Sequence, residues 1–452
     1  MLKIYLDWNI ITHLKKEDEK NTLLRKMFAK YCTYFVFPFS KAHLHDLGFG
    51  NKACPGYEKD IHNLSVLCGT HLLEFDNVIN GPYPYQCTPQ EYIEKREDDI
   101  EFFLSGFSKS KFHDLLSRVD YGYPSLKDIL YRYRIQPVKL PHLNKEVSNL
   151  GELTDLLLDD LSIMLRDTSV CGKIEAYIKD CNPEEYVKIK RSDFQTIFNL
   201  LDDICFEQVG KSVDDLLKMF CPQENSMNYF ISLYLLLNLV GYHSDKKRSL
   251  LNIITDAIHA YYASRCDVFV TNDHALKEKV KAVYNKCGIH TKVVEKDEIA
   301  QVMEDEAIAE FDVPNFIKKI LPTLEPQHLC EKEFFCFKKL SFRFLGLFNY
   351  CAVAIFDATN IMTVIFKLRL LPNDYIYYTE LLNFFEFVDD QLNEEESVQF
   401  NREYVDVFKS GNKDEIMSSH FDIKRDMYYI RLMADSDSEV PLPMMAFSIL
   451  VP

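Results

Sequence analysis

Several features that would assign this chain to a common class are missing from its sequence. Its thirteen cysteines include no CxxC pair and follow no regular spacing. This excludes a recognisable zinc signature and a disulfide framework. The plain interpretation is a set of reduced thiols in a cytosolic protein, many of them acting as small buried hydrophobic residues. The sequence also contains no internal repeat and no low-complexity segment.

Long hydrophobic runs and an excess of positive charge are missing too. The most apolar stretch, Tyr229 to Tyr242, is too short to span a bilayer, so it predicts a buried helix. The chain begins MLKIYLDWNIIT, without a basic segment followed by an apolar one, so we expect a cytoplasmic protein with no membrane partner. The formal charge of −17 disfavours binding of nucleic acid over the whole surface. A local basic groove, or a carboxylate cluster that needs a metal, remains compatible with that charge.

What is present is the composition of a folded protein with two or three domains. Hydrophobic residues make up 47% of the 452 positions and charged residues 27%. Strands alternate with helices in residues 1–80 and again in residues 244–300. This alternation predicts an α/β fold with a parallel sheet.

Two other regions differ from this pattern. Residues 81–243 contain helical stretches such as Glu97–Phe107, Gly151–Leu165 and Ser212–Phe220, so we predict a helical insertion there. Residues 325–452 are rich in aromatic and β-branched residues and predict a separate α+β accessory domain of unknown role. Within it, Val353–Leu370 has the pattern of one long strand.

Three segments carry aspartates at the ends of predicted strands or on helix faces: YLDWN at 5–9, SKAHLHD at 40–46, and the segment 255–273 that ends in TND. Ligands of open α/β sheets bind at the carboxyl ends of the strands. Asp7 follows the first strand and Asp273 follows the strand at 267–270, so both are expected at that edge.

The remaining polar candidates lie on predicted helices. Asn252, Asp256 and His259 are spaced by four and then three residues, which places them on one helix face. His43 and Asp46 share a face by the same rule. Four carboxylates in one cleft repel one another, so either their pKa values rise or a divalent cation binds. Oxygen ligands without cysteine favour Mg²⁺ or Mn²⁺, which can activate water and stabilise the leaving oxygen of a phosphodiester.

Together these segments resemble the PIN domain family of nucleases. The resemblance covers residues 1–80 and 244–300 and implies a Rossmann-like α/β/α sandwich with Mg²⁺- or Mn²⁺-dependent cleavage, most often of RNA. The second acid is an aspartate where the family more often has glutamate, and the helical insertion is atypical of small PIN toxins. By position, the acidic quartet of the family corresponds to Asp7, Asp46, Asp256 and Asp273, with Asn9 and Thr271 as supporting polar groups.

The resemblance leads to a set of functional expectations. We expect an endoribonuclease acting on single-stranded or structured RNA, such as a toxin or phage-defence effector, with a regulatory protein partner or homo-oligomer possible. His43, Asn252 and His259 are expected to support the carboxylates. Residues 244–300 hold ten Lys/Arg against eight Asp/Glu. Candidates for binding backbone phosphate are Lys246, Lys247, Arg248 and Lys277, although lysines on a helix are as often solvated surface.

Each acid also has a plainer interpretation. Asp7 can cap the helix that follows it, Asp46 and Asp256 can lie on solvated helix faces, and Asp273 can be a turn or N-cap residue. His43 and His259 can be structural. For the whole chain, the main alternative is a non-catalytic PIN-like scaffold that binds RNA or protein. A phosphatase with Asp7 as nucleophile is less favoured, because Asn9 stands where such an enzyme needs a second acid.

Overall fold

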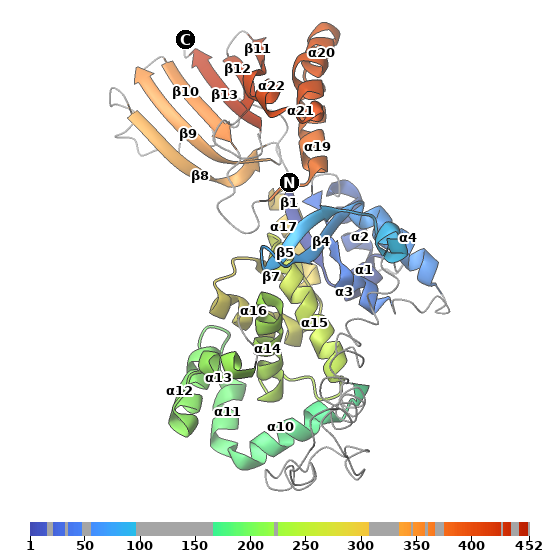
Figure 1. Ribbon diagram of the computed structural model, residues 1–452, viewed down its shortest axis with the longest axis vertical. Helices are drawn as coiled ribbons and strands as arrows, with labels where there is room; N and C mark the ends of the chain where they lie inside the picture. Colours follow the sequence, from blue (N-terminus) through green and yellow to red (C-terminus); the bar gives the residue numbers. More distant parts are fainter. Residues whose placement is uncertain are drawn as a thin grey trace, which may run out of the picture. The chain divides into compact units, whose positions relative to one another are not determined.

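The computed structural model describes a mixed α/β protein with a parallel sheet (Figure 1). The described residues are 1–15, 21–31, 35–47, 56–95, 166–220, 225–306, 334–344, 347–357, 360–366, 375–425, 428–434 and 443–450. The predicted helices at Glu97–Phe107 and Gly151–Leu165 lie outside these ranges. Two compact units are formed by residues 1–2, 26–36 and 300–452, and by residues 3–25 and 37–299.

The parallel sheet has the strand order β2-β1-β6-β7. Its bounds are β1 (Leu2–Leu6), β2 (Phe35–Val36), β6 (Val268–Val270) and β7 (Lys292–Val294). Short strands of β-branched and aromatic residues, buried along most of their length, are typical of a sheet covered on both faces. In the β1–β6 register Leu6 is paired with Val270, so Asp7 and Thr271 follow at the same edge. The Asp7 amide extends this ladder by donating to the Val270 carbonyl at 2.9 Å.

Four helices lead from this sheet to the candidate site: α1 (Trp8–Lys15), α3 (Lys41–Asp46), α15 (Leu250–Ala263) and α16 (His274–Cys287). Helix α15 begins after the N-cap Ser249, whose hydroxyl accepts from the Asn252 amide. It contacts α3, α16 and the apolar helix α14 (Ser226–Leu239). Figure 1 shows α14, α15 and α16 side by side. The packing of α15 against these three helices fixes the direction in which the polar side chains of α15 point.

A second sheet of this unit has the order β3-β4-β5. Strand β3 (Phe39–Ser40) runs parallel to β4 (His71–Asp76), which pairs antiparallel with β5 (Gly81–Gln86). The sheet therefore continues past residue 80, where the sequence predicts the insertion to begin. Further helices of the chain are α2 (Thr22–Tyr31), α4 (Tyr57–Cys68), α5 (Pro89–Lys95) and α17 (Lys296–Glu306).

The described part of the predicted insertion between residues 166 and 239 is helical. It comprises α10 (Val170–Cys181), α11 (Pro183–Arg191), α12 (Ile197–Val209), α13 (Val213–Phe220) and α14. The apolar run Tyr229–Tyr242 lies mostly in α14, so the prediction of a helix there is confirmed. Of the helices that the structure describes, none has the length and apolar character needed to cross a membrane.

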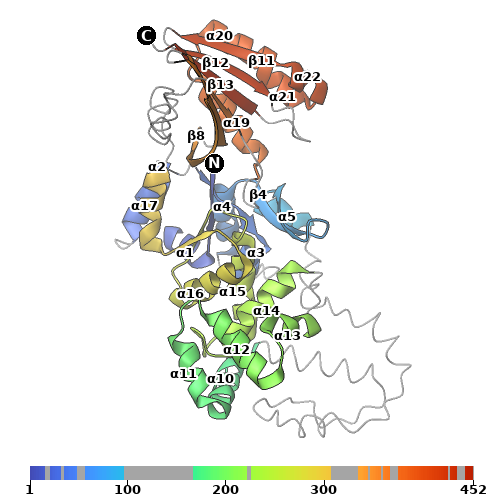
Figure 2. The ribbon, with the colours of Figure 1, turned by 90° about the vertical axis from the view of Figure 1, so that its left-hand side faces the viewer.

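The C-terminal residues form an antiparallel sheet with the order β11-β12-β13-β10-β9-β8 (Figure 1). Figure 2 shows β11, β12 and β13 of this sheet side by side. The sheet packs against helices through a core that includes Phe348, Phe384 and Ile430. These helices are α19 (Tyr378–Asp389), α20 (Glu394–Phe400), α21 (Asp406–Ser410) and α22 (Lys413–Ser418), with a π-helical turn at Asn401–Val405. The prediction of a single strand at Val353–Leu370 is wrong. Strand β9 ends at the polar residue Asp357, and the antiparallel strand β10 begins at Asn360. The strand bounds are β8 (Phe334–Phe344), β9 (Phe348–Asp357), β10 (Asn360–Phe366), β11 (His420–Arg425), β12 (Tyr428–Ala434) and β13 (Pro443–Leu450).

Candidate functional site

A cavity of about 570 Å³ opens at the carboxyl ends of β1 and β6. All four aspartates predicted from the sequence line it. Among the described residues, the lining consists of Asp7, Trp8, Asn9, Thr12, His13, Asp46, Asp245, Arg248, Asp256 and Asp273. Residues separated by more than 200 positions in the chain therefore meet in one polar cavity, at the sheet edge where ligands of this fold class bind.

Asp7 lies directly after β1 and is almost completely buried. Its Oδ2 accepts a hydrogen bond from Asn9 Nδ2 at 2.6 Å and another from Thr271 Oγ1 at 2.7 Å. Burial raises the pKa of the Asp7 carboxyl, although the charge of His259 and the Thr271 hydrogen bond act in the opposite direction. The backbone carbonyl of Asp7 also accepts from Ile10 at the start of α1. Asn9 and Thr271 thus hold the Asp7 carboxylate in place.

Asp46 and His259 complete one group with Asp7, which we call the histidine group. His259 Nε2 lies 2.8 Å from Asp46 Oδ2, and one ligand atom from each of the three residues lies within 4.8 Å of the others. Burial by itself lowers the pKa of His259, but the charge and hydrogen bond of Asp46 outweigh it, and the net pKa is raised. The histidine group has the spacing of residues that share one metal ion.

Buried polar side chains hold His259 from behind. Tyr5 Oη lies 3.0 Å from His259 Nδ1 and 2.6 Å from Ser40 Oγ. The Ser40 amide donates to His43 Nδ1 at 3.1 Å, so the neutral His43 ring carries its proton on Nε2 and donates it to the Leu6 carbonyl at 2.7 Å. Burial, with a contribution from nearby His259, lowers the pKa of His43 to about 3. His43 is therefore a neutral structural residue behind the cavity.

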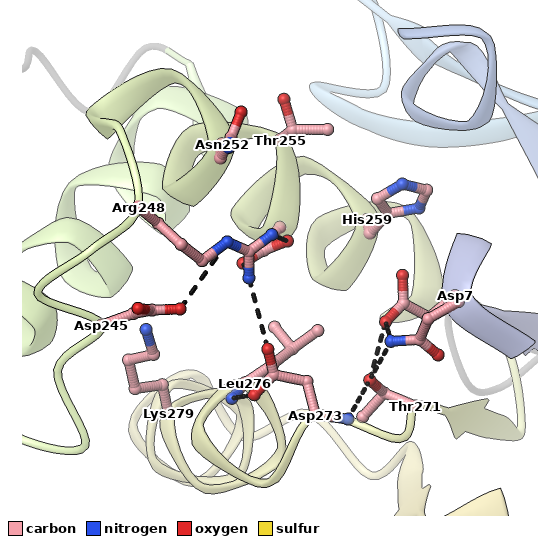
Figure 3. A network of polar contacts seen from close by, with 12 residues as sticks. Asp7, Asp245, Arg248, Asn252, Thr255, His259, Thr271, Asp273, Leu276 and Lys279 are labelled. Carbon is pink, nitrogen blue, oxygen red and sulfur yellow. Dashed lines mark hydrogen bonds and ion pairs between the residues drawn. The ribbon is translucent and has the colours of Figure 1, made fainter. Parts of the chain in front are cut away.

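The other two predicted aspartates share an arginine, and we call Asp256, Asp273 and Arg248 the arginine group (Figure 3). Arg248 forms a two-pronged contact with Asp256, with Nη1 to Oδ2 at 2.7 Å and Nη2 to Oδ1 at 3.0 Å. Its Nη1 also reaches Asp273 Oδ2 at 3.3 Å. Burial raises the pKa of Asp256 to about 7, opposed by Arg248 and reinforced by Asp7. Asp273 Oδ1 accepts from the Leu276 amide at 3.0 Å and so caps α16.

Two charged residues of this site were not singled out from the sequence. Asp245 lines the cavity, with its Oδ2 at 3.7 Å from Arg248 Nε. Lys279 is buried on α16, where Nζ donates to Asn238 Oδ1 at 3.0 Å and the charges of Asp256 and Asp273 act on it. Asp245 stands in a basic stretch, and Lys279 resembles the solvated lysines around it. Only their tertiary contacts distinguish Asp245 and Lys279 from ordinary surface residues.

The remaining predicted residues lie away from the cavity. Asn252 is exposed and does not contribute to the lining, and Figure 3 shows it apart from Asp7. Lys246 forms an ion pair with the buried Glu175 at 3.0 Å. Lys277 forms ion pairs with Glu295 and Glu298. Lys247 is exposed. Of the four cations predicted to bind substrate, Arg248 is the one in the cavity lining.

Comparisons with known proteins found no match to this chain. No known family model matches the chain. No curated protein and no solved structure matches it either. The resemblance to PIN domains therefore stays an interpretation of its residues, and the chemistry of the cavity follows from its own geometry.

Proposed function

We propose that the chain is a metal-dependent nuclease that hydrolyses phosphodiester bonds of RNA in the cavity at the end of β1. The observation that carries this proposal is the histidine group. Its three potential ligand atoms, from Asp7, Asp46 and His259, lie within 4.8 Å of one another at the carboxyl edge of a parallel sheet. A bound divalent cation supplies there a polarised water and charge stabilisation for the departing oxygen.

The charge balance of the cavity supports a cation. Five aspartates line it, whereas Arg248 and the adjacent Lys279 are the cations that interact with them among the described residues. With all five aspartates ionised, and even with His259 protonated, two negative charges remain uncompensated in a partly buried site. Such carboxylates bind a cation or take up protons.

The donor set indicates which cation fits. The sequence predicted four carboxylate ligands and therefore Mg²⁺ or Mn²⁺. In the structure, two carboxylates and one imidazole lie closest together. Mg²⁺ prefers oxygen ligands, whereas imidazole is a good ligand for transition metals. We therefore propose Mn²⁺ as the preferred ion, with Mg²⁺ as a weaker substitute.

The residues around the histidine group prepare it for that role. Asn9 and Thr271 fix the orientation of Asp7. The Tyr5 hydroxyl can accept a hydrogen bond from His259 Nδ1 or donate one to it. His259 can therefore carry its proton on Nδ1 while its ring stays in place, which leaves Nε2 without a proton and able to bind a metal.

The choice of RNA, and a role as a toxin-like or phage-defence effector, rest on the PIN resemblance alone. The direct test is incubation of the full chain with labelled single-stranded RNA, hairpin RNA and single-stranded DNA in Mn²⁺, Mg²⁺ or EDTA. Asp7→Asn is compared with Asp180→Asn, which removes an exposed carboxylate on α10.

We expect cleavage of RNA in Mn²⁺ by the wild type and by the Asp180 variant, a rate lowered on the order of 10³-fold for the Asp7 variant, and no cleavage in EDTA. Cleavage that survives EDTA, or that keeps the wild-type rate after loss of the Asp7 charge, contradicts the proposal. Metal binding without cleavage of any polymer favours the non-catalytic scaffold instead.

A further inference from the structure

We infer that Arg248 is a built-in counter-cation of the acidic site, so that the cavity takes up one divalent metal ion per chain, at the histidine group, and excludes a second from the arginine group. This inference rests on the proposed function for the identity of the first cation. It adds a specific role for Arg248, which the sequence presented only as a candidate for phosphate binding.

The hydrogen bonds of the arginine group carry the inference. Both carboxylate oxygens of Asp256 accept from Arg248, at 2.7 and 3.0 Å. Asp273 Oδ2 accepts from Arg248 as well, and Asp273 Oδ1 accepts from the Leu276 amide. All four carboxylate oxygens of the pair therefore already have a donor. A metal ion at this position has to displace Arg248 from three of these contacts.

Displacement is unfavourable for electrostatic reasons. Asp256 is buried, and a charge-assisted, two-pronged pair with arginine is among the stronger polar contacts in proteins. Breaking one side of a buried pair costs considerably more than forming the pair gains. Asp245, at 3.7 Å from Arg248 Nε, adds a third carboxylate that holds the guanidinium in the cavity.

Among the described residues, the histidine group has no such resident cation. The ion pairs of Asp7 and Asp46 there include no lysine or arginine, and Asp46 is paired only with His259. A divalent ion therefore meets no fixed positive charge at the histidine group, whereas at the arginine group it competes with Arg248. Arg248 also lines the cavity and its side chain is one-third exposed, so its guanidinium can donate to a phosphate held beside the metal.

The number of Mn²⁺ ions per chain tests the inference without any need for cleavage activity. We would titrate the full chain with Mn²⁺ by calorimetry and by the loss of the free-Mn²⁺ electron paramagnetic resonance signal. The set comprises the wild type, Arg248→Met, Arg248→Lys and the neighbouring control Lys247→Met, which removes an exposed positive charge outside the cavity.

One Mn²⁺ per chain is expected for the wild type, Arg248→Lys and Lys247→Met, and two for Arg248→Met. Adding Asp273→Asn to Arg248→Met should return the count to one. Two ions in the wild type, or one in a folded Arg248→Met variant, overturn the inference.

If Arg248→Met fails to fold, Asp273→Asn in the wild-type background decides. It should keep one Mn²⁺ with unchanged affinity, and loss of that ion would place the metal at the arginine group. A wild type that binds no Mn²⁺ contradicts the proposed function itself, which distinguishes that failure from failure of the inference.

Discussion

The histidine group and the arginine group each contribute two aspartates to the same cavity, yet the protein satisfies them differently. Asp7 and Asp46 lie beside a histidine that can release its proton. Asp256 and Asp273 lie beside an arginine that is always charged. The number of carboxylates in a cavity therefore does not give the number of metal ions that bind there. That number depends on whether a permanently charged side chain already lies between the carboxylates.

The largest expected difference between the groups is in catalysis. Asp7→Asn should lower RNA cleavage in Mn²⁺ by on the order of 10³-fold, about 4 kcal/mol in transition-state free energy, because it removes a metal ligand. Asp273→Asn should lower it by roughly tenfold, since that residue acts through Arg248 and the α16 cap. Single-turnover rates measure both, with Asp180→Asn as the control. Equal losses would abolish the distinction between the two groups.

Metal affinity should depend on the histidine that gives the first group its name. His259→Gln removes a ligand and the hydrogen bond that orients Asp46, so Mn²⁺ binding should weaken by about 10–100-fold. Trp8, the single tryptophan of the chain, lines the cavity, and its fluorescence can report the binding of this paramagnetic ion. The matched control is His62→Gln, at an exposed histidine of α4. An unchanged affinity in His259→Gln would remove His259 from the site.

Arg248 should contribute to the free energy of unfolding when no metal is present. Arg248→Met leaves the buried Asp256 without its partner and should cost about 2 kcal/mol of unfolding free energy at pH 8. Because the pKa of Asp256 is raised to about 7, its carboxyl binds a proton more readily in the folded state than in the unfolded state. Its contribution to stability is therefore present at low pH and is lost as pH rises through 7.

The cost of Arg248→Met should accordingly be smaller at pH 5.5 than at pH 8, since a protonated Asp256 needs no counter-cation. Urea unfolding at the two pH values in EDTA measures this difference, with Lys247→Met as the matched variant. A cost that does not change with pH would mean that the arginine contributes packing and not charge.

Metal binding should also depend on pH. Burial raises the pKa of Asp7, and the neighbouring carboxylates raise the pKa of His259 despite its burial. Protons therefore compete with the metal, and Mn²⁺ affinity should increase from pH 5.5 to 8, by at most about tenfold per pH unit for each proton released. Calorimetry across this range should give a shallower slope for His259→Gln. A flat profile in the wild type would show that no proton leaves on binding.

The sequence predicted those parts of the site that depend on regular structure. Strand ends placed Asp7 and Asp273 at one sheet edge, and both line the cavity that opens there. Helical spacing placed Asp256 and His259 on one face of α15, and both lie buried around the cavity. These predictions succeeded because strand and helix periodicity fix the direction of a side chain within its own element.

Strand and helix periodicity could not predict which residues from distant elements contact one another. Nothing in the sequence joins His259 to Asp46, 213 positions away. Arg248 lies in a loop before α15, where no periodicity sets the direction of its side chain, so its contact with Asp256 could not be predicted. The same holds for Tyr5, which has the sequence of an ordinary strand residue yet lies at the centre of a buried polar network.

The position of the bound metal in a crystal is the most direct test of a single Mn²⁺ site at the histidine group. Crystals of the full chain soaked in Mn²⁺ should give one anomalous difference peak per chain, between Asp7, Asp46 and His259, with Arg248 still paired with Asp256. A peak between Asp256 and Asp273 with the arginine displaced, or no peak in the cavity, would contradict the account.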